Sequence, residues 1–219
     1  SNIVLYLDTL QTKNSLIRSI TQTDPLSTLV LTAAKVTNDF AVLAKINNGS
    51  YLARLGGSAV TIQNALTYIG LVPNLSVRIS DTSANIASGM DDMGVINSHI
   101  SSITPSNLSD PVSLTPDQYD QYSDLIAKFS SFAVIKLVDV ASITDALNYA
   151  SYSNVSLIEL DSATVNAVTA SPPVYISIPY SVYSNTTFAN KIHALLPDRS
   201  LIVTGAPADQ TADIKVFSS

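Results

Sequence analysis

The sequence predicts an α/β fold in which parallel strands alternate with crossover helices. Short runs rich in Val, Ile, Leu and Tyr have the length and composition of strands. Segments with a helical spacing of apolar residues lie between these runs. Successive strands are about 20–25 residues apart, which is the spacing of strand–helix units in a parallel sheet. The order of elements also recurs, which indicates an internal repeat of about 80 residues.

The strands and helices are predicted from these patterns in chain order. Strands are expected at residues 29–31, 134–138, 157–160 and 201–203. Helices are expected where apolar residues recur at i, i+4 and i+7, as they do over residues 36–46 and 62–69. Each strand is therefore followed by a segment that can cross back over the sheet.

Capping residues mark where the helices begin. Residues 115–118 combine a capping Thr, a first-turn Pro and a Gln three positions on. Residues 80–83 and 142–145 are further candidate N-caps. Gly56 and Gly57 predict the turn between a strand and its helix.

Two places depart from the simple alternation. Residues 3–7 are a strand-like run that opens the chain. The runs at 100–103 and 112–114 are too close together for an intervening helix, so a hairpin or bulge is expected around residues 107–110.

The internal repeat is visible as matching blocks. Residues 14–21 (NSLIRSIT) return as residues 97–104 (NSHISSIT), a shift of 83 positions, which is the difference between 97 and 14. Residues 28–46 match residues 110–129, with a weaker third copy at residues 173–192. The blocks keep the same order, so the similarity extends beyond one local motif.

Further paired blocks are residues 51–66 with 132–147, and residues 75–86 with 155–165. In these blocks Asp81 falls on Asp161, with Asp8 as a third counterpart. We expect a single repeat-built domain that is a fragment of a longer chain, with copies at residues 1–27 (partial), 28–110, 111–172 and 173–219 (partial).

Two architectures fit repeated β–α units with parallel strands. Strands stacked in chain order give an open α/β solenoid, similar to a leucine-rich-repeat arch. Closure of eight units gives a (β/α)₈ barrel. The solenoid is preferred, because three strand–helix units in each copy do not divide into eight.

The composition excludes several function classes. Cys is 0, which removes disulfides, cysteine-ligated metal sites and thiol nucleophiles. Only 13% of residues are charged, and the net charge of −6 disfavours nucleic acid as a partner. No apolar run reaches the ~18–20 residues that span a bilayer. Apolar residues make up 46% of the chain, enough for a packed core.

Three blocks resemble the repeats of very large secreted bacterial proteins. Residues 77–87 (VRISDTSANIA), 100–103 (ISSI) and 114–119 (LTPDQY) are similar to the "DTAANI", "I-x-S-I" and "L-T-x-x-Q" motifs of RTX or haemolysin-type exoproteins, adhesins and surface-layer-like proteins. The resemblance covers about residues 5–192. Residues 161–165 are a degenerate copy, and the glycine-rich calcium nonapeptides of RTX tails are absent.

The resemblance implies type I secretion and an extracellular location at the bacterial cell surface. It carries no catalytic residue and no calcium motif to this chain. The expected function is therefore a non-catalytic structural or adhesive region of a surface-layer protein or adhesin, and not an enzyme. The expected partners are neighbouring repeats or protomers and cell-surface glycan.

Residues with catalytic potential are few and scattered. The two histidines, His99 in a presumed strand and His193 at the end of a helix, lack clustered partners. Gly56-Gly57-Ser58 lacks the second glycine spacing of a nucleophile elbow. Asp81 and Asp161 recur at strand ends, where capping of helices is favoured over catalysis. A polysaccharide hydrolase using either acid is the alternative function, and a small-ligand module with its site after the strands is another.

Two groups of side chains are candidate binding sites. Asp117, Asp120 and Asp124 share one face of a predicted helix, which fits either a Ca²⁺ site or a solvated surface. Four tyrosines recur in pairs that would either bind a partner or pack on the sheet: Tyr119, Tyr122, Tyr180 and Tyr183. No other cofactor is expected.

Overall fold

The computed structural model of the chain describes residues 2–24, 26–164, 176–179, 201–204 and 215–216. The chain divides into two compact units: residues 1–108 with 122–133, and residues 109–121 with 134–219. Both contain helices and parallel strands, which confirms the predicted α/β class. Among the described helices, none combines the length and apolar character that crossing a membrane requires.

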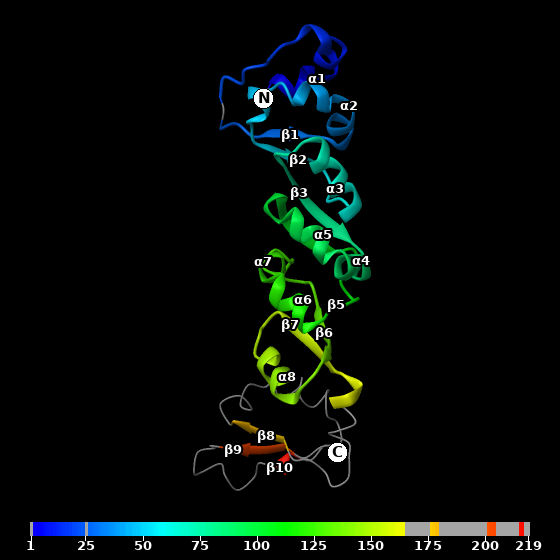
Figure 1. The fold of residues 1–219 in the computed structure, drawn as a ribbon, viewed down its shortest axis with the longest axis vertical. Helices are drawn as coiled ribbons and strands as arrows, with labels where there is room; N and C mark the ends of the chain where they lie inside the picture. The colour runs from blue at the N-terminus through cyan, green and yellow to red at the C-terminus, as the bar shows by residue number, and fades with distance from the viewer. Residues whose placement is uncertain (1, 25, 165–175, 180–200, 205–214, 217–219) are drawn as a thin grey trace. The chain divides into compact units, whose positions relative to one another are not determined.

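The first unit is built on a four-stranded sheet in which neighbouring strands are parallel and follow chain order (Figure 1). Its strands are β1 (Leu29–Leu31), β2 (Ala53–Leu55), β3 (Leu75–Asp81) and β4 (Ile100–Pro105). In β1 and β2 buried residues alternate with exposed ones, and in β3 every second residue is buried. This period of two places one face of each strand in the core.

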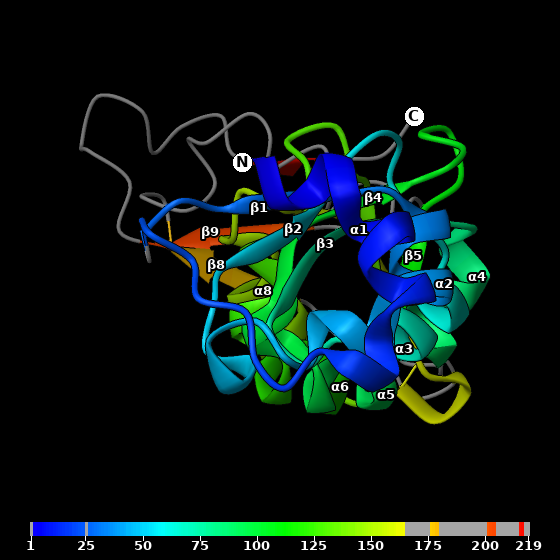
Figure 2. The same cartoon turned by 90° about the horizontal axis from the view of Figure 1, so that it is seen from above.

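Helices cover this sheet, and Figures 1 and 2 both place α2 and α3 on the same face of it. The helices of the first unit are α1 (Asn2–Thr12), α2 (Ala33–Leu43), α3 (Ile62–Leu71), α4 (Ser83–Ser88), α5 (Met90–Val95) and α7 (Ser123–Ile126). Threonine caps α2, α3 and α4: the hydroxyls of Thr32, Thr61 and Thr82 each accept a hydrogen bond from a backbone N–H three positions on.

The second unit contains a parallel sheet in the order β5-β6-β7 and a further sheet in the order β10-β9-β8. Its elements are β5 (Val112–Leu114), α6 (Pro116–Gln121), β6 (Ile135–Val140), α8 (Ile143–Ala150), β7 (Val155–Leu160), β8 (Ile176–Pro179), β9 (Leu201–Thr204) and β10 (Lys215–Val216). The predicted capping box is confirmed, because Thr115 and Gln118 exchange side-chain to backbone hydrogen bonds of 3.1 and 3.2 Å. Ser142 likewise caps α8 through the N–H of Asp145.

Elements recur at a nearly constant offset between residues 2–81, which we call module A, and residues 85–160, which we call module B. The 3₁₀ turns η1 (Asn14–Leu16) and η3 (Asn97–His99) are 83 positions apart, the difference between 97 and 14. The same offset separates β1 from β5 and the start of α2 from the start of α6. The strands β2 and β3 reappear as β6 and β7, at offsets of 82 (from 53 to 135) and 80 (from 75 to 155).

A parallel bridge recurs with this offset. In module A the N–H of Ile20 donates to the Lys45 carbonyl at 2.9 Å, and the Ile20 carbonyl accepts from the N–H of Asn47 at 2.8 Å. Module B repeats both bonds at the same lengths, from Ile103 to Lys128 and from Ser130 to Ile103. The chain after α2 and the chain after α7 are thereby joined to equivalent extended segments.

In each module a lysine ammonium donates hydrogen bonds to the 3₁₀ turn or its immediate neighbour. Lys45 Nζ donates to the carbonyls of Asn14 and Ile17 at 2.6 and 2.7 Å. Lys128 Nζ donates to the carbonyl and the side-chain oxygen of Asn97 at 2.5 and 2.6 Å. Each asparagine carbonyl also accepts a hydrogen bond from the backbone N–H three positions on, so the ammonium adds a charge-assisted hydrogen bond to a turn that is already closed.

The strand expected at residues 3–7 is wrong, because these residues belong to α1. Leu7 is fully buried, whereas Leu5 and Tyr6 are 74% and 60% exposed. Only one face of the segment therefore meets the core. A helix satisfies its own backbone hydrogen bonds in that setting, while a strand would need a neighbouring strand to satisfy them.

The hairpin expected around residues 107–110 is also wrong. β4 pairs in parallel with β3, and β5 pairs in parallel with β6, so the two strands belong to different sheets. Their short connection leads from one sheet to the next instead of reversing the chain. Sequence spacing excluded a helix there but could not identify the partner of each strand.

The two lysine contacts give the first testable prediction. Lys45→Met and Lys128→Met each remove two charge-assisted hydrogen bonds. We expect each substitution to lower the free energy of unfolding by about 1.5–3 kcal/mol, measured by urea denaturation. Lys13→Met changes an exposed lysine and serves as the control. Losses no larger than that of the control would contradict the structural role of the two lysines.

Candidate functional site

Asp81 ends β3 at the carboxyl edge of the sheet, where parallel sheets commonly form ligand sites. Its side chain is nearly buried, and Oδ2 accepts a hydrogen bond of 3.0 Å from the N–H of Ile62, the first residue of α3. Oδ1 accepts from the N–H of Thr82 at 2.8 Å and from Nδ2 of Asn85 at 2.7 Å. One carboxylate thus binds the beginnings of both α3 and α4.

These donors determine the ionisation of Asp81. Burial by itself favours the neutral acid, but the hydrogen bonds from Asn85, Ile62 and Thr82 outweigh it and lower the pKa of Asp81. The side chain is therefore an anion that accepts three hydrogen bonds. A general acid needs the opposite environment, one that raises the pKa of the carboxyl group.

Asp161 and Asp8 do not reproduce this arrangement. Asp161 follows β7, and hydrogen bonds from the side chain and the backbone N–H of Thr164, the latter to Oδ1 at 2.6 Å, lower the pKa of Asp161. It caps the turn that it begins, and among the described residues no side-chain hydrogen bond joins it to a second helix. Asp8 lies within α1 and follows no strand. The recurrence of acids at strand ends is real for Asp81 and Asp161, but their contacts differ.

A buried acid that the sequence did not single out lies between α1 and α2. Asp39 is 1% exposed, and within the described residues its Oδ2 accepts no hydrogen bond. Lys35 Nζ lies 3.8 Å from that atom and 3.1 Å from Oδ1 of Asp8. Burial, a hydrogen bond with Asp8 and the negative charge of Asp8 raise the pKa of Asp39, and Lys35 opposes them only in part.

Module B replaces this acid with tyrosine. Asp91 and Tyr122 occupy the positions 83 beyond Asp8 and Asp39, and the Tyr122 hydroxyl donates to Asp91 at 2.5 Å. The ring of Tyr122 lies against Gly94, where an added Cβ would come within 2.8 Å of the ring. In module B the equivalent pair of residues is therefore joined by a hydrogen bond from a tyrosine hydroxyl, and no second acid is buried there.

Three tyrosines of the second unit form a cluster, which we call the tyrosine cluster: Tyr119, Tyr149 and Tyr152. The ring of Tyr119 is 5.8 Å from that of Tyr149, edge to face, and 5.9 Å from that of Tyr152. Tyr119 is buried, whereas Tyr152 is 50% exposed. The cluster thus has a packed base and an aromatic surface that could stack against a ligand.

Polar neighbours fix the orientation of the cluster. The Tyr119 hydroxyl donates to Oδ1 of Asn154 at 2.8 Å, and the Tyr149 hydroxyl donates to Oδ2 of Asp120 at 2.7 Å. Burial is the main cause that raises the pKa of both Tyr119 and Tyr149, so both are neutral at physiological pH. Of the four candidate partner-binding tyrosines, Tyr119 packs inside the fold and Tyr122 donates a hydrogen bond to Asp91, while Tyr180 and Tyr183 lie outside the described residues. Partner binding by these tyrosines stays a prediction.

The three acids expected as a calcium site do not share one helix. α6 ends before Tyr122, which leaves helical geometry at φ −108° and ψ 30°, so Asp117 and Asp120 precede the break and Asp124 follows it. No group of three His, Cys, Asp or Glu among the described residues is arranged to hold a metal ion. Calcium binding by these acids stays a prediction.

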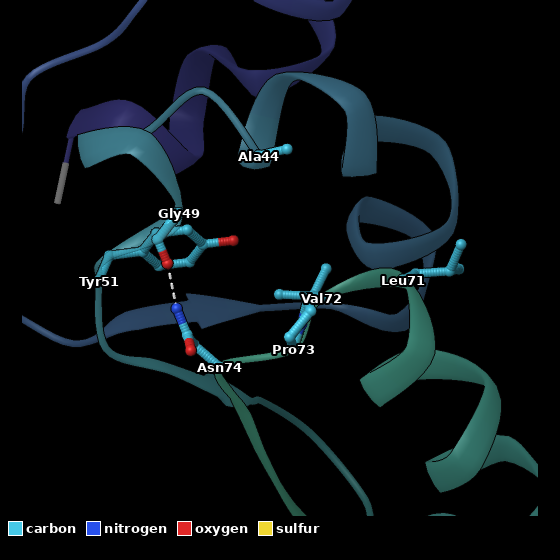
Figure 3. Close-up of a pocket in the computed structure, with 7 residues that line it drawn as sticks. All are labelled: Ala44, Gly49, Tyr51, Leu71, Val72, Pro73 and Asn74. Carbon is cyan, nitrogen blue, oxygen red and sulfur yellow. Dashed lines mark hydrogen bonds between the residues drawn. The ribbon is translucent and has the colours of Figure 1, made fainter.

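A hollow of about 220 Å³ lies in the first unit (Figure 3). Tyr51 and residues 71–74 line it together with Ala44 and Gly49. Its wall is mostly apolar. Burial raises the pKa of Tyr51 to about 12. Nδ2 of Asn74 donates a hydrogen bond to the Gly49 carbonyl. The lining residues precede β2 and β3, so the hollow is at the opposite edge of the sheet from Asp81.

The remaining candidates are the two histidines and the glycine pair Gly56-Gly57. His99 ends the turn η3 instead of lying in a strand, and His193 lies outside the described residues. Gly57 has φ +86° in the turn between β2 and α3, as expected for a glycine turn. An added Cβ at Gly56 would meet Val30 at 2.8 Å, so this glycine allows close packing of β1.

Comparisons of the chain with protein-family models, curated protein sequences and solved structures found no match.

Asp81 supplies the second prediction. Asp81→Asn removes the charge that accepts three hydrogen bonds, and we expect the free energy of unfolding to fall by about 2–3 kcal/mol at neutral pH. The pKa of Asp81 is lowered by folding, so its stabilisation is complete above the ordinary value of 3.8 and is lost as the pH falls through the folded value. Urea denaturation over this range measures both effects. Asp161→Asn is the matched control, and an equal loss there would contradict the special role of Asp81.

Asp39 supplies the third prediction, with the opposite sign. Because folding raises its pKa, the neutral acid stabilises the fold below 3.8, and this stabilisation is lost as the pH rises through the folded value. Asp39→Asn should therefore raise the free energy of unfolding at neutral pH by about 1 kcal/mol and give little change in acid. Asp124→Asn, at an exposed acid, is the control. A loss of stability at neutral pH would show that Lys35 dominates instead.

Proposed function

We propose that the chain is a non-catalytic structural and adhesive region of a secreted bacterial cell-surface protein, such as a surface-layer protein or an adhesin. The observation that carries the proposal is the repetition of one strand–helix module with the same bridge and with a lysine bound to the equivalent asparagine carbonyl. Repeated modules of this kind build extended scaffolds, in which each module packs against its neighbours. An open α/β solenoid is the proposed arrangement, with a (β/α)₈ barrel as the alternative.

The surroundings of Asp81 support this proposal over a hydrolase. A hydrolytic acid pair needs one carboxyl that holds a proton and a second one facing it across the substrate. The carboxylate of Asp81 accepts hydrogen bonds from the starts of two helices, and its pKa is lowered instead of raised. This acid is committed to holding the module together.

Composition and sequence motifs support the proposed location. The chain is free of cysteine, carries few charges and takes its surface polarity from Ser, Thr and Asn. The resemblance of residues 77–87 to repeats of secreted bacterial exoproteins points to type I secretion and an extracellular, cell-surface role. In the fold these residues form the end of β3 and the start of α4, which Thr82 caps.

The tyrosine cluster is the proposed contact for cell-surface glycan. Sugar rings present apolar C–H faces that stack on aromatic side chains, and Tyr152 offers a half-exposed ring on a rigid base. Asp120, which binds Tyr149, adds a hydrogen-bond acceptor beside the cluster. Such a surface binds without any reacting group.

The fourth prediction tests adhesion and catalysis together. The purified chain should be retained on immobilised bacterial surface polysaccharide and should release no reducing ends from it. Tyr152→Ala should weaken retention about tenfold, corresponding to the loss of about 1–1.5 kcal/mol of aromatic contact.

Tyr6→Ala is the matched control, because Tyr6 is also exposed but lies outside the cluster. Release of reducing ends that Asp81→Asn abolishes would overturn the non-catalytic proposal. Retention that Tyr6→Ala and Tyr152→Ala reduce equally would overturn the assignment of the contact to the tyrosine cluster.

A further inference from the structure

Within the described part of the chain, residues 17–22 form backbone pairing along one edge only. Ile17 has the extended geometry of a strand, at φ −93° and ψ 122°. Ile20 makes the parallel bridge to the chain after α2. No strand among the described residues pairs with the other edge.

Module B shows which kind of strand pairs with the edge that is open in residues 17–22. The equivalent segment there is β4, in which Ile103 makes the same bridge on one edge. The other edge of β4 pairs in parallel with β3, in the register Arg78 to Ser102, Ile79 to Ile103 and Ser80 to Thr104. Since neighbouring residues of a strand direct their backbone groups to opposite sides, Ser19 and Thr21 present the open edge in module A.

The isoleucines of residues 17–22 are less buried than the equivalent isoleucines of β4, as expected if the neighbouring strand is missing in module A. Ile100 and Ile103 of β4 are 3% and 0% exposed, whereas their counterparts Ile17 and Ile20 are only half-buried. Leu16, next to them, is 81% exposed. The apolar side chains of residues 16–20 therefore lack the cover that β3 gives to β4.

The chain also contains a strand of the type that would provide this cover. β7 is the counterpart of β3, because both are third strands that pair in parallel with the strand before them. In the sheet β5-β6-β7 it is an edge strand, and no described strand pairs with its outer side. Leu157 on β7 is 43% exposed. Arg18 in the open segment and Glu159 on β7, which forms an ion pair with Lys136, have opposite charges.

We propose that residues 17–22 of one molecule bind in parallel to the outer edge of β7 of a second copy of this chain. The contact adds a strand across two molecules and repeats the pairing that β3 and β4 make within one molecule. It is heterologous, because two different surfaces meet, so it continues from molecule to molecule. The inference rests on the proposed structural function and names its partner.

The fifth prediction tests this contact by sedimentation velocity on the full chain. We expect the mass of the wild-type chain to rise with concentration above the 23.2 kDa monomer, up to the millimolar range. Thr21→Pro removes an N–H from the open edge without breaking any hydrogen bond that the structure describes, and it should weaken association about tenfold or more. Leu157→Asp places a charge on the other edge and should do the same.

Mixing the two variants gives the decisive result. Each variant keeps the surface that the other has lost, so an equimolar mixture should form a one-to-one dimer while each variant alone stays monomeric. Thr21→Val keeps the N–H and should associate like the wild type. Circular dichroism confirms that each variant is folded.

Two results would overturn the proposal: a wild-type chain that stays monomeric, or variants that do not complement each other. Binding of a synthetic β3 peptide, residues 75–81, to a chain that does not self-associate would likewise overturn the second copy as the partner. None of these results would alter polysaccharide retention or the absence of reducing-end release. Failure of this contact is therefore distinguishable from failure of the proposed function.

Discussion

The ammonium of a lysine that follows a helix holds each module to the turn that precedes its sheet. Lys45 binds the carbonyls of Asn14, in the turn η1, and of Ile17, just after it, and Lys128 binds Asn97 in the turn η3. The backbone of the same lysine accepts the bridge from Ile20 or Ile103. One residue thus joins a turn, an extended segment and the end of a helix through charge-assisted hydrogen bonds in a partly buried setting.

The differences between the modules show where the sequence has been adapted. Asp8 and Asp91 are equivalent, but the first meets a buried acid with a raised pKa and the second meets a tyrosine hydroxyl. Gln11 accepts a hydrogen bond from the N–H of Val42 in module A, and Gly94 at the equivalent position makes room for an aromatic ring. The contact of the lysine with the Asn14 or Asn97 carbonyl is kept in both modules, while the contact between these helices changes.

Local patterns in the sequence predicted much of the fold. The α/β class, the parallel strands and the caps at Thr115 and Ser142 depend on residues close together in the chain, so they could be read directly. The helix at residues 2–12 and the separate sheets of β4 and β5 depend on what packs against them, which no local pattern reports. The candidate site was predicted only in part. Asp81 was recognised as a capping acid, but its second helix was not, because Ile62 is 19 residues away.

The most direct test of the repeated lysine contact is amide hydrogen exchange, followed by NMR at Ile20 and Ile103. If each lysine holds its own module, both amides are protected in the wild-type chain. Lys45→Met then accelerates exchange at Ile20 and leaves Ile103 protected, and Lys128→Met does the reverse. Exchange at both amides as fast as at exposed loop amides, or equal acceleration of both by either substitution, would contradict the account.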